Sequence, residues 1–143
     1  MIKKSRKTLV ALTMGDPSGI STEITLKAWK SKKSKSPFFL IHDPQYVQKI
    51  IKRMDINVKI KVIKHPNETF KYYKKYLPIL AIKIDSLTRL GKPNRKNAKN
   101  IMDSINKAVS IVDSGNASSM VTNPISKEII NKIQRSFLHF FYL

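Results

Sequence analysis

The stretch MGDPSGI, residues 14–20, decides the fold that this sequence predicts. Before it, residues 8–13 (TLVALT) form a short apolar run, which is typical of a buried strand. After it, residues 22–33 are expected to form a helix with Ser21 as its N-cap. A buried strand, a turn with two glycines and a helix, in this order, indicate one unit of a layered α/β protein.

A second stretch, VTNPISK (121–127), also lies where a strand is expected to give way to a helix. Residues 118–122 predict the strand and residues 125–132 the start of the helix. Open α/β sheets bind ligands at the carboxyl ends of their strands, so the small and polar residues of both stretches are candidate site residues. The residue types alone leave a second interpretation open, in which both stretches are structural turns without a role in binding. Asp16 can cap its own turn, and Lys127 is one of many lysines.

Between the two stretches, strand and helix patterns alternate along the chain. The expected strands are apolar or alternate with β-branched residues, and the expected helices have apolar residues three and four apart. The strands are predicted at 38–41, 58–63 and 78–84, and the helices at 45–53 and 98–112, with Gly115 as a stop and 91–100 as a polar surface loop. This alternation predicts the α/β class, with a mostly parallel sheet layered with helices.

The charge of the chain is unusual. Lys and Arg number 28 and Asp and Glu number 9, which gives a formal net charge of +19. Such a surplus is compatible with nucleic-acid binding, and the tract KYYKKY (71–76) interleaves aromatic and basic residues as a single-strand-binding surface does. The basic residues are mostly lysines scattered along the chain, which favours a solvated surface. We therefore expect no nucleic-acid partner and keep a basic nucleic-acid-binding module as an alternative function.

Composition excludes several other classes of protein. The chain contains no cysteine, so disulfides and thiolate metal sites are excluded. The longest apolar runs, such as residues 37–41, are far too short to span a bilayer, and no membrane association is expected. The basic start of the chain precedes only a short apolar stretch, which makes a poor signal peptide. A cytoplasmic location is therefore expected.

The two stretches resemble the signatures of one enzyme family. MGDPSGI followed by Glu23 and Ile24 resembles the N-terminal signature of the 4-hydroxythreonine-4-phosphate dehydrogenases, which usually reads MGDPAGIGPE. This chain has Ser21 and Thr22 where the family has Gly-Pro, and the helix start is expected to survive because serine is a good N-cap. VTNPISK resembles the family segment Thr-(Gly or Asn)-Pro-(Ile or Val)-x-Lys. The resemblance extends over residues 8–131, with pattern agreement between the two motifs.

The resemblance implies a fold, a reaction and site residues. The fold would be the N-terminal part of an isocitrate/isopropylmalate-dehydrogenase-like fold, in a homodimer that serves pyridoxal phosphate biosynthesis. The reaction would be oxidation of 4-phosphohydroxy-L-threonine with decarboxylation, using NAD and a divalent metal (Zn, Mg or Co). The implied active-site loop residues are Gly15, Asp16, Ser18 and Gly19, and the implied residues for positioning a phosphorylated substrate are Thr122, Asn123 and Lys127.

The features that complete the family's site are not found in this sequence. In the family, a Gly-His-Thr-Glu segment, three metal-binding histidines and the NAD region lie further along the chain. Here His42 and His65 stand beside Pro-containing turns, and His139 is isolated. Because a lone histidine makes no metal site, the family's metal ligands are expected to lie beyond Leu143. We therefore expect no metal ligand, no NAD site and no dehydrogenase activity in these residues alone.

The end of the sequence differs in character from the rest. Residues 137–143 are almost wholly apolar, and exposed apolar surface of this kind favours aggregation. Residues 1–132 are expected to form the N-terminal α/β part, and 133–143 an aberrant apolar tail from a truncating frameshift. A designed terminal strand is the other interpretation of the tail. For the chain as a whole, a non-catalytic remnant is a further alternative.

Overall fold

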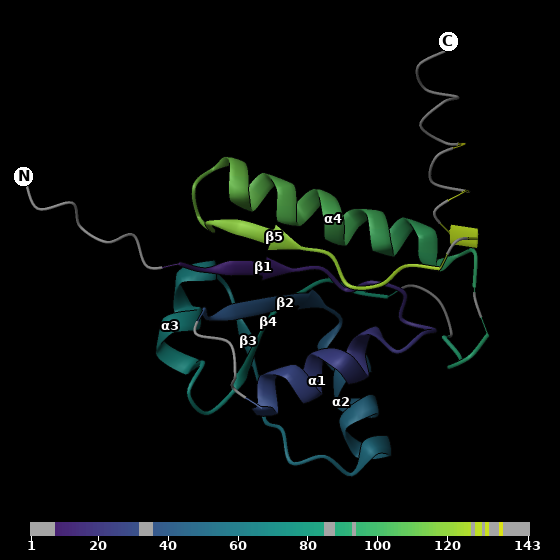
Figure 1. Ribbon diagram of the computed structural model, residues 1–143, viewed down its shortest axis with the longest axis horizontal. Coiled ribbons are helices and arrows are strands. Elements are labelled where there is room, and N and C mark those ends of the chain that lie inside the picture. The colour runs from purple at the N-terminus through teal and green to yellow at the C-terminus, as the bar shows by residue number, and fades with distance from the viewer. Residues whose placement is uncertain are drawn as a thin grey trace, which may run out of the picture.

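The computed structural model describes residues 8–31, 36–84, 88–92, 94–126, 128, 129, 131 and 135. Within these residues five strands form one sheet: β1 (Val10–Leu12), β2 (Phe38–His42), β3 (Ile60–Ile63), β4 (Leu77–Ala81) and β5 (Ser119–Val121). The strand order is β3-β4-β2-β1-β5, and every neighbouring pair is parallel (Figure 1). The prediction of an α/β fold with a mostly parallel sheet is confirmed.

The helices lie in two layers on the sheet. The described α-helices are α1 (Ser21–Ser31), α2 (Pro44–Met54), the short α3 (Thr69–Tyr72) and the long α4 (Asn97–Asp113). A 3₁₀ helix, η1 (Pro66–Glu68), directly precedes α3. Helices α1 and α2 cover one face, and α4 covers the other (Figure 1). None of the helices among these residues is long and apolar enough to cross a membrane.

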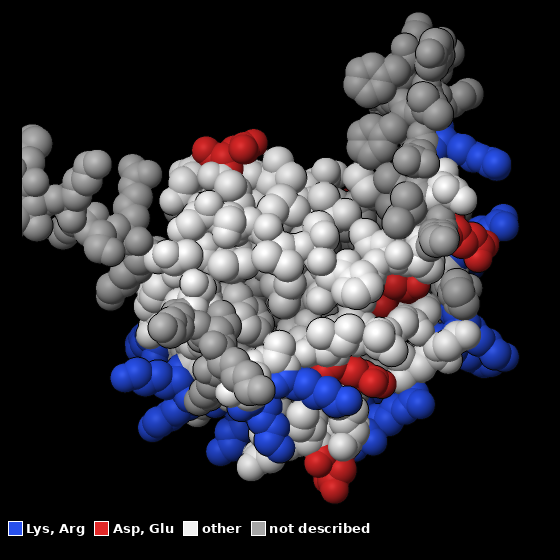
Figure 2. Space-filling model, viewed as in Figure 1, with Lys and Arg blue, Asp and Glu red and all other residues white. Residues whose placement is uncertain are grey.

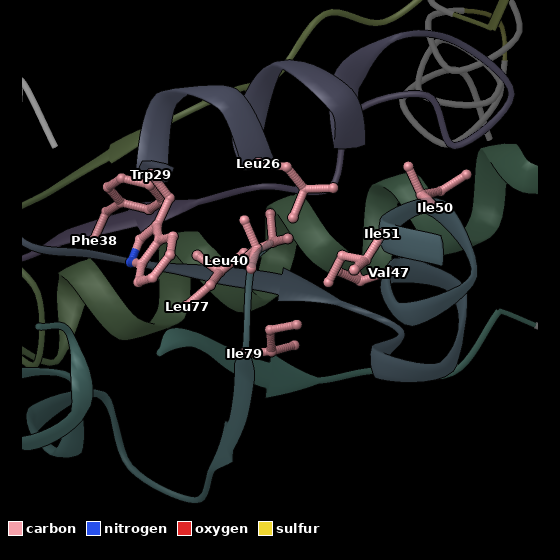
Figure 3. Close-up of a cluster of buried hydrophobic side chains, with 10 residues drawn as sticks. Leu26, Trp29, Phe38, Leu40, Val47, Ile50, Ile51, Leu77 and Ile79 are labelled. Carbon is pink, nitrogen blue, oxygen red and sulfur yellow. The ribbon is translucent and has the colours of Figure 1, made fainter. Parts of the chain in front are cut away.

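Two buried clusters hold the layers to the sheet. On the α1 and α2 face, Trp29 of α1 and Val47 of α2 pack in one cluster with Leu40 of β2 (Figure 3). On the opposite face, Phe39 of β2 belongs to a cluster with Ala108 of α4. Successive strand residues point to opposite faces, and every residue of β2 is buried. This two-sided burial explains why β2 is a continuous apolar run rather than an alternating one.

The sequence patterns located most elements, and two local expectations are wrong. Residues 97–100, expected in a polar surface loop, form the first turn of α4. Ser21 is the first residue of α1 and not its N-cap, because the carbonyl oxygen of Ile20 accepts the first helical hydrogen bond, from Ile24 N at 2.9 Å. The hydroxyl of Ser21 instead donates to Pro124 O at 2.9 Å. The short η1 and α3 were not expected from the sequence.

The last expected helix and the tail fall partly outside the described residues. The helix expected at 125–132 is helical at residues 128, 129 and 131, whereas Lys127 and several of its neighbours lie outside the described residues. Of the tail expected at 133–143, only residue 135 is described, and Leu143 lies outside the described residues as well. The division into an α/β part and an aberrant tail therefore stays a prediction.

Asp43 joins the start of α2 to the segment that follows β4. Its Oδ1 accepts hydrogen bonds from Gln45 N (2.8 Å) and Tyr46 N (3.3 Å), and its Oδ2 accepts one from Ile84 N (3.0 Å). We expect Asp43→Ala to lower the free energy of unfolding by about 1–3 kcal/mol, because the cap and a buried acceptor are lost together. Asp43→Asn, which keeps one carbonyl oxygen as a cap, should lose less. Urea unfolding measures both variants, and equal losses would contradict this account.

Candidate functional site

The two motif stretches leave neighbouring strands at the carboxyl edge of the sheet. Strand β1 pairs with β5, and the loop after β1 leads into α1 on one face. The segment after β5 turns to the other face, where Ile125 and Ile129 join a buried cluster with Ile101 of α4. Two adjacent parallel strands whose connections diverge to opposite faces form a topological switch point, where ligands of open α/β sheets bind.

The two loops interlock at Gly15. The backbone N–H of Asp16 donates to Pro124 O at 3.0 Å, and Gly15 has a φ of +67°. A Cβ atom at Gly15 would lie 2.6 Å from the Cβ of Asn123 and 2.8 Å from Pro124 O. Glycine is therefore required at position 15 both for the positive φ and for the close approach of the second loop.

Asn123 ties the second loop to β1 and α1. Its side-chain amide nitrogen donates to Thr13 O and to the hydroxyl of Thr25, both at 2.9 Å, and its backbone N–H donates to the Thr13 hydroxyl at 3.3 Å. The residue is buried. Both amide hydrogens of Asn123 are thus used inside the protein, and the side chain holds the shape of the loops.

Asp16 and Ser18 organise the first loop in a similar way. Ser18 N donates to the Asp16 carboxylate at 2.9 Å, which forms an Asx turn. The Ser18 hydroxyl accepts a hydrogen bond from the side-chain amide of Asn97 at 3.1 Å, and Ser18 O accepts one from Gly91 N at 2.7 Å. Asp16, Ser18 and Asn97 are all buried. The first loop is therefore braced by the start of α4 and by the segment before it.

The candidate residues divide into buried and accessible groups. Gly15, Asp16, Ser18 and Asn123 are buried, Gly19 is half-buried, and Thr122 is exposed. Lys127 lies outside the described residues. The structure thus brings the loop residues together with Asn123 and leaves Thr122 accessible. Their roles in binding or catalysis stay predictions.

A buried histidine supports the first loop from the α2 side. Asp43 N donates to His42 Nδ1 at 2.7 Å, so the ring proton is on Nε2, which donates to the Thr22 hydroxyl at 3.1 Å. The ring of Tyr46 stacks on His42 with centroids 5.4 Å apart, and its hydroxyl donates to Pro17 O. Burial lowers the pKa of His42 to about 4, although the Asp43 carboxylate acts to raise it. Burial also raises the pKa of Tyr46 to about 12, with Asp16 and Glu23 acting in the same direction and Arg53 against it.

His42 is consequently neutral at neutral pH, with both ring nitrogens engaged. It is not available as a metal ligand or a general base. Across the described part of the chain, no three His, Cys, Asp or Glu side chains form a group that could hold a metal ion. The described residues therefore do not fit the catalytic metal that the resemblance implies, and we derive no step through a metal. That the family's metal ligands lie beyond Leu143 stays a prediction.

The side chains that brace the loops carry no recognisable signal in the sequence. Asn97 was expected within a polar surface loop, yet it is fully buried against Ser18, which lies 79 positions away. Tyr46 and Thr22 had no role assigned. The proline and glycine signals identify the turns, but a single sequence contains no signal that pairs residues so far apart.

The surface is hollowed at several places in the described part of the chain, one of them, of about 380 Å³, lined by Arg95, Glu128, Asn131 and Arg135. A hollow of about 390 Å³ lies at the carboxyl edge, between the ends of β2 and β4, and its lining includes Gln45, Ile82 and Lys83. A larger hollow of about 910 Å³ lies at the opposite edge, between Asn67 and Ser118. None of these hollows has residues 14–20 or 121–126 in its lining.

A parallel sheet with two interlocked loops at its carboxyl edge defines the class, an open α/β protein, and proteins of this architecture bind ligands at such a switch point. The sequence also matches a family model, described as pyridoxal phosphate biosynthetic protein PdxA, over residues 33–139. The chain belongs to this family.

Individual relatives agree with this assignment. The 4-hydroxythreonine-4-phosphate dehydrogenase of Methylorubrum extorquens is 37% identical over 128 residues, covering 87% of this chain and 36% of the relative. That of Zymomonas mobilis is 34% identical over 130 residues, covering 90% of this chain and 37% of the relative. The chain therefore spans little more than a third of the length of these relatives.

The solved structures show the same fold. The crystal structure of 4-hydroxythreonine-4-phosphate dehydrogenase from Klebsiella pneumoniae aligns with a TM-score of 0.74 and 22% identity, covering 87% of this chain and 39% of that one. A terephthalate 1,2-cis-dihydrodioldehydrogenase from Burkholderia xenovorans aligns with a TM-score of 0.65 and 19% identity, covering 88% of this chain and 37% of that one. The N-terminal part of an isocitrate-dehydrogenase-like fold, which the resemblance implied, is confirmed.

Proposed function

We propose that this chain corresponds to the N-terminal part of a 4-hydroxythreonine-4-phosphate dehydrogenase and contributes the two interlocked loops to its active site. The observation that carries the proposal is the approach of Gly15 to Asn123 and Pro124 at the switch point, in a chain of this family. These two stretches of sequence contain the residues that the family resemblance assigns to the site. The proposed location agrees with the general rule for ligand binding by open α/β sheets.

The proposed reaction is oxidation of the secondary alcohol of 4-phosphohydroxy-L-threonine. NAD, when bound, would supply the acceptor for the two electrons and the hydrogen removed from the alcohol carbon, and the keto acid so formed would lose carbon dioxide. In this proposal the metal and NAD sites belong to the rest of a family-length protein. In this proposal the described residues position substrate, with the exposed Thr122 as a hydrogen-bonding side chain at the carboxyl edge of the sheet. The homodimer and the cytoplasmic location also stay proposals.

A complementation experiment tests the proposal. The host is a bacterium that lacks its own 4-hydroxythreonine-4-phosphate dehydrogenase and needs added pyridoxine. We expect the 143-residue chain alone not to restore growth. We expect growth when the chain is joined to the remaining C-terminal part of the Methylorubrum extorquens relative. Growth with the chain alone, or no growth with a folded joined protein, would contradict the proposal.

Thr122 supplies a sharper test in the purified joined protein. Thr122→Val removes an exposed hydroxyl at the carboxyl edge and should lower kcat/KM for 4-phosphohydroxy-L-threonine about tenfold. Thr8→Val is the matched control, because Thr8 is also exposed but lies at the amino edge of the sheet. NAD reduction measures both variants, and an equal effect of the two would argue against a substrate role for Thr122.

No specific observation favours the nucleic-acid alternative. In the tract of residues 71–76, the Tyr72 ring has Lys71 Nζ at 5.3 Å and Tyr76 edge-on at 6.4 Å, and Lys61 Nζ of β3 lies 5.1 Å from its centroid. The Tyr72 ring thus interacts with neighbouring side chains of its own chain. We therefore do not propose that this tract stacks bases.

A further inference from the structure

A basic hollow lies at the amino edge of the sheet, away from the two motif loops. Its volume is about 310 Å³, and its lining consists of Trp29, Asn57, Lys59, Lys74, Lys75 and Tyr76. Trp29 lies near the end of α1, whereas the first motif loop precedes the start of that helix. The other lining residues lie just before β3 and β4 begin, at Ile60 and Leu77. In a parallel sheet the starts of the strands share one edge, so this hollow is on the opposite edge from the motif loops.

Strand pairing holds the two lysine-bearing segments beside each other. Ile60 of β3 is in register with Leu77 of β4, and Leu77 N donates to Lys59 O at 2.8 Å. Lys59 is therefore next to the start of β4, which Lys74 and Lys75 closely precede. The sheet, and not a single run of charged residues, brings the three lysines to one hollow.

The lining of the hollow combines charge of one sign with an apolar wall. Trp29 is only 5% exposed and belongs to a buried cluster with Leu40, whereas the three lysines are exposed (Figure 3). No acidic side chain is among the described residues that line the hollow. A cleft of this composition focuses the electric potential and concentrates counter-ions. The ammonium groups of the lysines repel one another, and a bound anion would offset that repulsion.

The surrounding surface is basic as well. In the view of Figure 2, Lys and Arg side chains crowd the lower part of the molecule, over α1, α2 and α3, whereas the surface over α4 and β5 is almost without them. In this view the basic side chains therefore gather on the side of the sheet that α1 and its Trp29 cover. This charge distribution attracts anions to the side of the molecule on which the hollow lies.

The chemistry of the lining suits a diphosphate group. Lysine binds phosphate as a point charge, and three lysines match an anion that has several negative charges. Asn57 and Tyr76 add groups that can donate hydrogen bonds to phosphate oxygens. A volume of about 310 Å³ is at the lower end of the range for ligand sites, which fits a small anion better than a stretch of a polymer. We propose that this hollow binds a diphosphate group, either as inorganic pyrophosphate or as part of a nucleotide.

Trp29 reports on this hollow directly, because it is the only tryptophan in the chain. The 143-residue chain is titrated with sodium pyrophosphate at constant ionic strength while the fluorescence of Trp29 is recorded. We expect a saturable change, and we expect Lys59→Gln combined with Lys75→Gln to raise the dissociation constant about tenfold or more. Lys96→Gln combined with Lys107→Gln is the matched control, since these exposed lysines belong to the cap and body of α4, on the other face of the sheet. The control lowers the net charge equally and should change the dissociation constant less than about twofold.

Further titrations distinguish the sources of the diphosphate group. Tighter binding of pyrophosphate than of ADP would identify the free ion as the ligand, and the reverse order would identify a nucleotide. Absence of a saturable change, equal weakening by the two double variants, or an equal response to sulfate would overturn the proposal. Tighter binding of a single-stranded oligonucleotide than of either probe, with a steep dependence on salt, would overturn it in favour of a nucleic-acid surface. Each of these results leaves the proposed function untouched, since none of the lining residues belongs to the motif loops.

Discussion

Gly15→Ala is expected to lower the free energy of unfolding by about 2–5 kcal/mol, a large fraction of the roughly 5–15 kcal/mol that is typical of native proteins. Alanine must adopt the φ of +67° found at Gly15, which is unfavourable for an L-residue with a side chain. Its Cβ would also lie within 2.8 Å of Ser21 Oγ, Asn123 Cβ and Pro124 O, so all three must move. Pro124 O is a backbone atom that cannot rotate away, so the loops must separate.

Gly115→Ala is the matched control for this prediction. Gly115 has a φ of +75°, close to that of Gly15, but nothing lies within 4 Å of the position its Cβ would take. Gly115→Ala should therefore lose only the backbone contribution, about 1 kcal/mol. Urea unfolding of both variants separates the steric contact from the backbone strain. Equal losses would show that the approach of the two loops contributes nothing to stability.

The order of strands and helices could be predicted because local patterns are strong in this chain. The continuous apolar run of β2 indicates a strand that is buried on both faces, and the apolar spacing of α4 indicates a helix that is buried on one face. The structure shows this burial for both elements. The pairing of strands could not be predicted in the same way. Strand β1 pairs with β5, far along the chain, and no local pattern distinguishes that neighbour from β3 or β4.

The positions of the two motif loops at strand ends could be predicted from the sequence, but not the contacts between them. Glycine and proline placed both loops at strand ends, and the family resemblance joined them into one site. The hydrogen bond between Asn123 and Thr25, 98 positions apart, depends on the packing of α1 beside β5 and cannot be inferred from residue types. Ser21 shows the same limit, because serine before a helix predicts a cap. Here its hydroxyl donates instead to a carbonyl oxygen of the second loop.

His42 is expected to make the stability of this protein fall steeply below neutral pH. Its pKa is lowered to about 4 in the folded protein, chiefly because burial disfavours the charged ring, while the ordinary value is 6.5. The unfolded chain therefore binds more protons than the folded one between these values. The stabilisation is fully present above pH 6.5 and is lost as the pH falls towards 4. The loss over that interval amounts to about 3 kcal/mol.

Urea unfolding at several pH values between about 7 and 4 measures this loss, and two variants assign it. His42→Asn should be less stable than the unmodified chain at neutral pH, since the bond to Thr22 and the stacking on Tyr46 are weakened. Its stability should vary less with pH in this interval, because the group that titrates is gone. His65→Asn replaces an exposed histidine and should keep the original pH dependence. If His42→Asn showed the same pH dependence of stability, carboxylates would be responsible for that dependence. The buried, neutral imidazole of His42 would then not contribute to it.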